Sequence, residues 1–191
     1  MKLSFSTRGW ADHSWDELVS TALEMDFSGI EIHNPIINAV FTGKGGPLER
    51  YNTQATARAL RDKGLCIPAL DSSVDISAGK EQIQAAKDLI DLAAAAGVER
   101  VVVVAQNDDE DAIHAALAEL VPYAEASDVV LLIESSGIFS STTRMAGIMD
   151  RYASDYLGTL WDVHNVYRTG GETPAQTVKN LGAYIKHVHM R

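Results

Sequence analysis

The chain has 191 residues, of which 46% are hydrophobic, and 16 Lys and Arg against 26 Asp and Glu give a net charge of −10. This length and composition predict one globular domain over residues 1–191. The negative charge repels phosphate backbones, so we expect no nucleic-acid partner. No apolar run approaches the roughly 20 residues that span a bilayer, and no signal-peptide pattern opens the chain, so we expect no membrane partner and a cytoplasmic location.

Short apolar runs rich in β-branched residues alternate with helical patterns. The runs start about every 30 residues, which is the length of one strand with its crossover helix. They are KLSF (2–5), GIEIH (29–33), CIPAL (66–70), RVVVVA (100–105), VVLLIE (129–134), YLGTLWD (156–162) and YIKHVH (184–189). The alternation predicts a parallel sheet with helices outside. It leaves open a doubly wound sheet or most of an eight-stranded barrel.

Helical patterns fill the intervals between these runs. One covers 14–26 and opens with a capping box formed by Ser14 and Glu17. Others cover 81–97 and 109–126, where Pro122 predicts a kink or a break. The one long irregular stretch is 34–52, and a loop of that length is usually a lid or a binding loop.

Polar residues favour the barrel. Glu31, Glu134, Asp162 and His189 fall at or near the carboxyl ends of the expected strands, where TIM-type barrel enzymes place their chemistry. The predicted fold class is therefore α/β, an incomplete (β/α) TIM-type barrel of about seven parallel strands with outer helices.

Three of these residues predict a metal site. Glu134, Asp162 and His189 each follow an apolar run, on consecutive strands, and two carboxylates with one imidazole suit Mn²⁺, Mg²⁺, Co²⁺ or Zn²⁺. A turn carboxylate at Glu134 and a helix cap at Asp162 are the structural alternatives. His187 shares the strand face of His189 and is expected to lie behind it. Cys66 is predicted to be a core residue, not a nucleophile.

The sequence resembles the xylose-isomerase-like TIM-barrel family, which includes sugar epimerases, inosose isomerases and dehydratases, and the endonuclease IV group. The resemblance rests on FSTRGW, GIEIHNP, LLIESSGIF, LWDVHNVYRTGGETP and HVHMR. It implies metal binding by Glu134, Asp162 and His189. The family's fourth ligand is a glutamate on strand eight, so we expect this chain to lack the last βα unit, as a fragment more readily than as a barrel completed by another copy.

The activity implied by the resemblance is proton transfer next to the carbonyl of a sugar or sugar phosphate, through an enediolate, as in isomerases and epimerases. Glu134 would be one acid/base group, and without the second this chain alone is expected to be inactive. Substrate contacts are expected from Glu31, His33, His164 and Arg191. Many relatives carry a histidine where this chain has Asn165.

Two other functions stay open. One is an inosose-type dehydratase, a lyase with the same ligands, and the other is a non-catalytic barrel module that binds a sugar or a partner. An endonuclease IV activity is not expected, because LDSS (70–73) and VAQN (104–107) lack the histidines of its zinc cluster. The open edges of an incomplete barrel predict a possible homodimer.

Overall fold

The computed structural model describes residues 2–10 and 12–190. The chain divides into two compact units. The first unit consists of Met1–Ser72 and Asp88–Val101, and the second unit of Ser73–Lys87 and Val102–Arg191.

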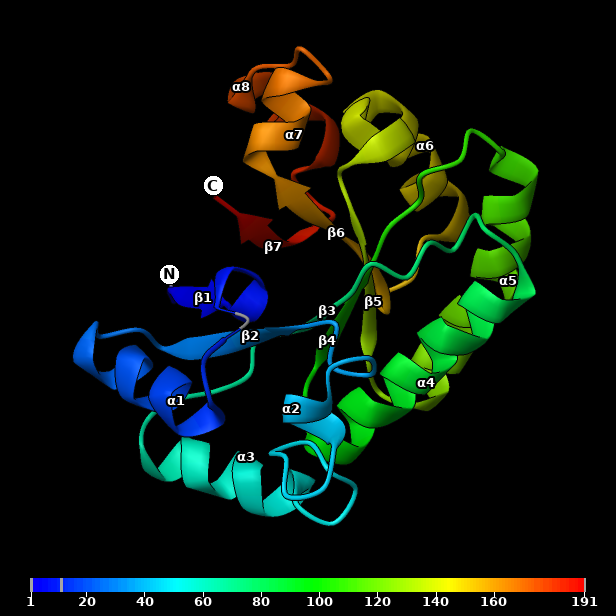
Figure 1. The fold of residues 1–191 in the computed structure, drawn as a ribbon. Helices are drawn as coiled ribbons and strands as arrows, with labels where there is room; N and C mark the ends of the chain where they lie inside the picture. The colour runs from blue at the N-terminus through cyan, green and yellow to red at the C-terminus, as the bar shows by residue number, and fades with distance from the viewer. Residues whose placement is uncertain (1, 11, 191) are drawn as a thin grey trace. The chain divides into compact units, whose positions relative to one another are not determined.

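Seven parallel strands follow one another in sequence order (Figure 1). They are β1 (Ser4–Ser6), β2 (Gly29–His33), β3 (Leu70–Asp71), β4 (Arg100–Val103), β5 (Val130–Glu134), β6 (Leu157–Asp162) and β7 (Ile185–His189). Strands in sequence order, each followed by helix, are the repeating unit of a TIM-type barrel, which is complete at eight. The predicted fold class, an incomplete barrel of seven parallel strands, is confirmed.

The first unit contains β1 to β3 and the start of β4. Its helices are α1 (Trp15–Glu24), α2 (Ala39–Thr42) and α3 (Thr53–Asp62). The predicted capping box starts α1: the Ser14 hydroxyl accepts the backbone N–H of Glu17, and the Glu17 carboxylate accepts the backbone N–H of Ser14 at 2.8 Å. These bonds satisfy two of the N–H groups that a helix start leaves without partners.

The stretch 34–52 is more ordered than the sequence predicted. It contains the short helix α2, whose cap Asn38 accepts the N–H of Val40 at 3.0 Å. The following loop is fastened to α3, because Asn52 donates to the carbonyl of Gly46 at 3.0 Å and Thr56 donates to that of Pro47 at 2.7 Å.

The prediction that Cys66 lies in the core is wrong, because its thiol side chain is exposed. Only Leu70 and Asp71 form strand β3. Pro68 has no backbone N–H to give to a ladder, so the apolar run before it cannot extend the strand. Cys66 instead makes an isolated bridge to Gly29.

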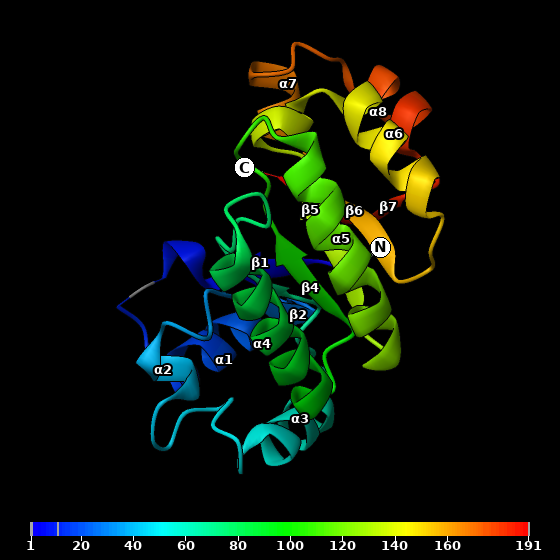
Figure 2. The ribbon, with the colours of Figure 1, turned by 90° about the vertical axis from the view of Figure 1, so that its right-hand side faces the viewer.

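The second unit contains β5 to β7, which pair in parallel. Its helices are α5 (Glu110–Ala126), α6 (Thr142–Tyr152), α7 (Val163–Arg168) and α8 (Pro174–Leu181), and α4 (Lys80–Ala96) passes from this unit into the first. α6 and α8 lie side by side (Figure 2). α5 continues through Pro122, so the proline does not end the helix. Among the described helices, none is both long and apolar enough to cross a membrane.

Candidate active site

The carboxyl ends of β5, β6 and β7 carry the predicted metal ligands. Glu134, Asp162 and His189 are the last residues of these three strands. In the register, Asp162 pairs with His189, while Leu160, two residues earlier on β6, pairs with both Glu134 and His187. Paired residues of parallel strands share a face, and so do residues two apart. Both carboxylates and both histidines therefore project from one face of the sheet.

The two carboxylates are buried. Glu134 is 4% exposed and Asp162 is 0% exposed. A buried carboxylate is costly unless hydrogen bonds or a cation compensate the loss of water. His187 and His189 are half-buried, and their ring centroids lie 5.4 Å apart with the planes at 75°.

Asp162 also starts helix α7. Its Oδ1 accepts the backbone N–H of Asn165 at 2.8 Å, as an N-cap residue does. Its own backbone N–H donates to the hydroxyl of Ser135 at 2.8 Å, and Ser135 is fully buried. The end of β6 is thus tied both to α7 and to the end of β5. The helix cap that the sequence offered as an alternative role for Asp162 is present.

Asn165 joins the two carboxylates. While its backbone N–H binds Asp162, its side-chain Nδ2 donates to Oε1 of Glu134 at 3.1 Å. The sequence predicts a substrate contact not from Asn165 but from its neighbour His164, whose side chain is exposed on α7. The signal that could have found Asn165 is its position, three residues after an N-cap aspartate.

In the first unit, Glu31 and His33 share one face of β2. Glu31 is 2% exposed. His33 is held at both ring nitrogens: Nδ1 lies 2.7 Å from Oδ2 of Asp71, and Nε2 lies 3.0 Å from Nδ2 of Asn34. Its backbone N–H donates to the Thr7 hydroxyl at 2.9 Å. Asp71 was not among the predicted site residues, although it follows an apolar run as the other carboxylates do. Arg191 lies outside the described residues.

The predicted ligands in the second unit are of the types that divalent cations prefer, but the ligand atoms of Glu134, Asp162 and His189 do not all lie within 4.8 Å of one another in this structure. Glu134 and Asp162 offer carboxylate oxygens and His189 offers an imidazole nitrogen, all from neighbouring strand ends and on one face. Mixed oxygen and nitrogen ligands of this kind suit Mn²⁺, Co²⁺ and Zn²⁺, and the carboxylates also suit Mg²⁺.

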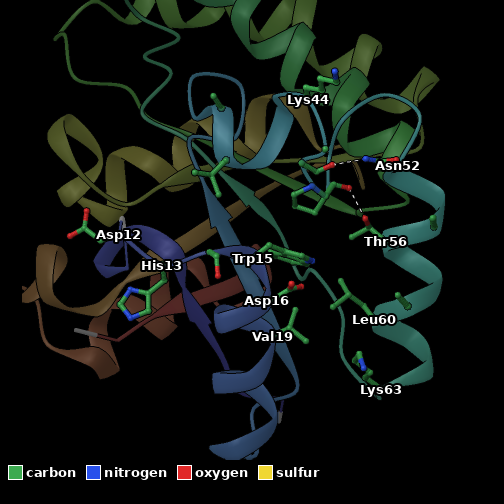
Figure 3. Close-up of a pocket in the computed structure, with 18 residues that line it drawn as sticks. Asp12, His13, Trp15, Asp16, Val19, Lys44, Asn52, Thr56, Leu60 and Lys63 are labelled. Carbon is green, nitrogen blue, oxygen red and sulfur yellow. Dashed lines mark hydrogen bonds between the residues drawn. The ribbon is translucent and has the colours of Figure 1, made fainter.

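A cavity of about 770 Å³ lies elsewhere, in the first unit between α1, α2 and α3. Figure 3 shows Trp15 extending from α1 toward α3 within it. The loop that carries Lys44 also lines the cavity. None of the predicted site residues that the structure describes lines this cavity, so the candidate chemistry is at the strand ends instead.

The family model for xylose isomerase-like TIM barrels matches residues 19–191. The chain belongs to this family. The predicted resemblance is therefore confirmed over most of the chain. No curated protein sequence matches this member of the family significantly.

Solved structures of xylose isomerase-like proteins share the fold. The probable 3-DHS dehydratase AsbF from Bacillus anthracis is 18% identical with a TM-score of 0.81, over 100% of this chain and 73% of the other. An L-ribulose 3-epimerase is 18% identical with a TM-score of 0.75, over 98% and 69%. The IolI protein, solved with a bound zinc atom, is 18% identical with a TM-score of 0.79, over 99% and 72%. Identities this low show the fold alone.

Proposed function

We propose that this protein is a metal-dependent isomerase or epimerase that moves a proton next to the carbonyl of a sugar or sugar derivative. The observation that carries the proposal is the pair of buried carboxylates at the ends of β5 and β6, with His189 on the same face of the sheet. Family membership supports it, as do the similar structures whose names record an epimerase and a bound zinc atom.

Glu134, Asp162 and His189 would hold the cation. When bound, a divalent cation polarises the carbonyl and hydroxyl oxygens of the substrate and so acidifies the carbon between them. Glu134 would take the proton from this carbon and return it, which interconverts sugars through an enediolate. Epimerisation needs a second acid/base group on the opposite side of the carbon, so Glu134 acts with a partner.

Substrate hydroxyls are proposed to bind Glu31, His33 and His164, as the sequence suggested. His33 has the best support, because Asp71 fixes the orientation of its ring, and a substrate hydroxyl would take the place of the Asn34 amide on Nε2. A side chain with a fixed orientation loses little conformational freedom when a ligand binds.

A dehydratase is the second candidate, because a structure named as a probable dehydratase has a TM-score of 0.81 with this chain. It would use the same first step and then expel a hydroxyl as water. Incubating sugars and cyclic ketones in D₂O and following them by NMR separates the two reactions. Deuterium at the carbon next to the carbonyl with loss or inversion of its configuration supports the epimerase, and release of water with a new double bond supports the dehydratase.

Calorimetric titration with Mn²⁺, Co²⁺, Zn²⁺ and Mg²⁺ tests the site itself. We expect Glu134→Gln and Asp162→Asn to weaken binding strongly. Asn is as good an N-cap as Asp, so Asp162→Asn removes the charge while α7 keeps its start. Glu110→Gln is the matched control, because Glu110 is a carboxylate of the same unit that pairs with Arg144 on the surface. Absence of binding to the wild-type chain would refute the metal-dependent proposal and favour the non-catalytic binding module.

A further inference from the structure

Asn165 occupies the third position of α7, where a side chain points back toward the start of the helix. Because α7 begins directly after Asp162, the amide is aimed at the strand ends. Nδ2 donates to Oε1 of Glu134 at 3.1 Å, and the backbone N–H donates to Oδ1 of Asp162 at 2.8 Å. One residue therefore binds two carboxylates that come from different strands.

Burial and hydrogen bonds restrict the side-chain conformations of these two carboxylates. Glu134 is 4% exposed, and Ser135 and Asp162 are fully buried. Ser135 accepts the backbone N–H of Asp162, which adds a second tie between the ends of β5 and β6. The positions of the two carboxylates are thus set together by the end of β5 and the start of α7.

The chemistry of the amide suits this position. An ionised carboxylate only accepts hydrogen bonds, so the NH₂ group of Asn165, and not its carbonyl oxygen, must face Glu134. Two neighbouring carboxylates repel each other in a buried site. A neutral residue that donates to both lowers this repulsion and adds no charge that would compete with a cation.

We propose that Asn165 is a positioning residue that holds Glu134 and Asp162 in one geometry, so that a divalent cation meets both carboxylates without reorienting either. The inference rests on the metal-binding part of the proposed function. Partners that orient metal ligands from outside typically change metal affinity by about 10–100-fold when they are removed.

Calorimetric titration with Mn²⁺ tests the role of Asn165. We expect Asn165→Ala to bind about 10–100-fold more weakly than the wild-type chain. Asn165→Asp keeps the backbone N–H but sets a third carboxylate against Glu134, so it should bind at least as weakly as Asn165→Ala. Asn165→His supplies a ring N–H and should recover part of the loss.

Asn180→Ala is the matched control. Its amide also makes hydrogen bonds within the second unit, to the hydroxyls of Thr142 at 2.8 Å and Thr143 at 3.2 Å, but these lie on α6. We expect it to bind Mn²⁺ within about twofold of the wild-type chain. The visible spectrum of the Co²⁺-loaded protein, which reports ligand geometry, should change in Asn165→Ala and stay the same in Asn180→Ala.

A double-mutant cycle in the metal-free protein tests the contact independently of metal binding. If Asn165 holds Glu134, the loss of stability in urea from Asn165→Ala should be smaller in a Glu134→Ala background. The inference is overturned if Asn165→Ala keeps wild-type Mn²⁺ affinity and the wild-type Co²⁺ spectrum, or if the two substitutions are additive. Failure of the wild-type chain to bind Mn²⁺ refutes the proposed function, and the cycle then still decides whether Asn165 fixes Glu134.

Discussion

Nδ1 of His33 lies 2.7 Å from Oδ2 of Asp71, and the two side chains are 15% and 1% exposed. Because an ionised Asp71 can only accept, Nδ1 carries the hydrogen in this pair. The other ring nitrogen, Nε2, then accepts from the amide of Asn34 at 3.0 Å. A hydrogen on Nδ1 satisfies both contacts, so Asp71 and Asn34 together fix the orientation of the His33 ring.

We expect His33→Ala to destabilise the protein by about 1.5–3 kcal/mol, because it removes the hydrogen bond from a buried carboxylate. Urea denaturation at pH 7 measures the change. Asp71→Asn should recover part of the loss in the His33→Ala background, since a neutral amide is cheaper to bury than a charge. His164→Ala, at an exposed position, should change stability by less than about 0.5 kcal/mol. Equal effects of the two histidine substitutions would contradict this account.

The two histidines of β7 should differ in their effect on metal binding. His189 pairs with Asp162 at the strand end, whereas His187 pairs with Leu160 deeper in the sheet. Removing a residue that only orients a metal ligand typically weakens metal binding by about 10–100-fold. We expect His189→Ala, which removes a proposed ligand, to weaken Mn²⁺ binding by more than about 100-fold, and His187→Ala to weaken it by about 100-fold or less. Calorimetric titration of the two variants gives the comparison, and the reverse order would show that His187 is the ligand.

Tyr152 should make the stability depend on alkaline pH. Burial raises the pKa of its phenol above the ordinary value of 10.0, and the hydroxyl donates to the backbone carbonyl of His114 at 2.8 Å. The folded chain therefore holds this proton more tightly than the unfolded chain. Its contribution is fully present below pH 10 and is lost as pH rises through the higher folded pKa.

We accordingly expect Tyr152→Phe to lower stability at pH 8 by about 0.5–1.5 kcal/mol. The difference from the wild-type chain should shrink as the pH passes 10 and continues to rise. Urea denaturation in steps from pH 8 to 11 follows it, with Tyr51→Phe as control because Tyr51 is 86% exposed. A difference that stays constant across this range would rule out the titration of Tyr152 as its cause.

Two glycines should respond in opposite directions to alanine. A Cβ at Gly29 would lie 2.6 Å from the backbone oxygen of Cys66, whereas a Cβ at Gly147 meets nothing within 4 Å. We expect Gly29→Ala to cost about 1–3 kcal/mol, because backbone must shift. Gly147→Ala, inside α6, should stabilise by about 0.5–1 kcal/mol. Thermal and urea denaturation measure both changes. If Gly29→Ala leaves the stability unchanged, the backbone around β2 accommodates the added Cβ at little cost.

Strand β7, at one edge of the described sheet, should promote dimerisation of this chain. β7 comes last in the strand order, and on it Val188 is 42% exposed. Exposed edge strands pair with other chains, and charged side chains prevent this. We expect concentration-dependent dimers in light scattering, and more monomer in Val188→Lys. A monomer at every concentration would refute the homodimer.

Much of the fold could be predicted because its signals are local. The Ser14 capping box and the apolar runs need only near neighbours, and Glu134 and Asp162 end the strands that these runs predicted. The exposure of Cys66 and the shortness of β3 depend on the position of Pro68, which cannot donate a hydrogen bond to the neighbouring strand. The contacts of Asn165 with Glu134 and of His33 with Asp71 join residues 31 and 38 positions apart. No periodicity in one sequence encodes such pairs.

The double role of Asp162 has a consequence for experiments that follow the protein in time. The backbone amide hydrogen of Asn165 is bonded to the carboxylate proposed to bind the cation. A cation bound to this carboxylate would weaken its hydrogen bond to the amide of Asn165, and so change the rate at which that amide exchanges its hydrogen for deuterium. Exchange at this single amide therefore offers a reporter of metal occupancy that needs neither substrate nor turnover, and it connects the chemistry of the strand ends to the unwinding of the first turn of α7.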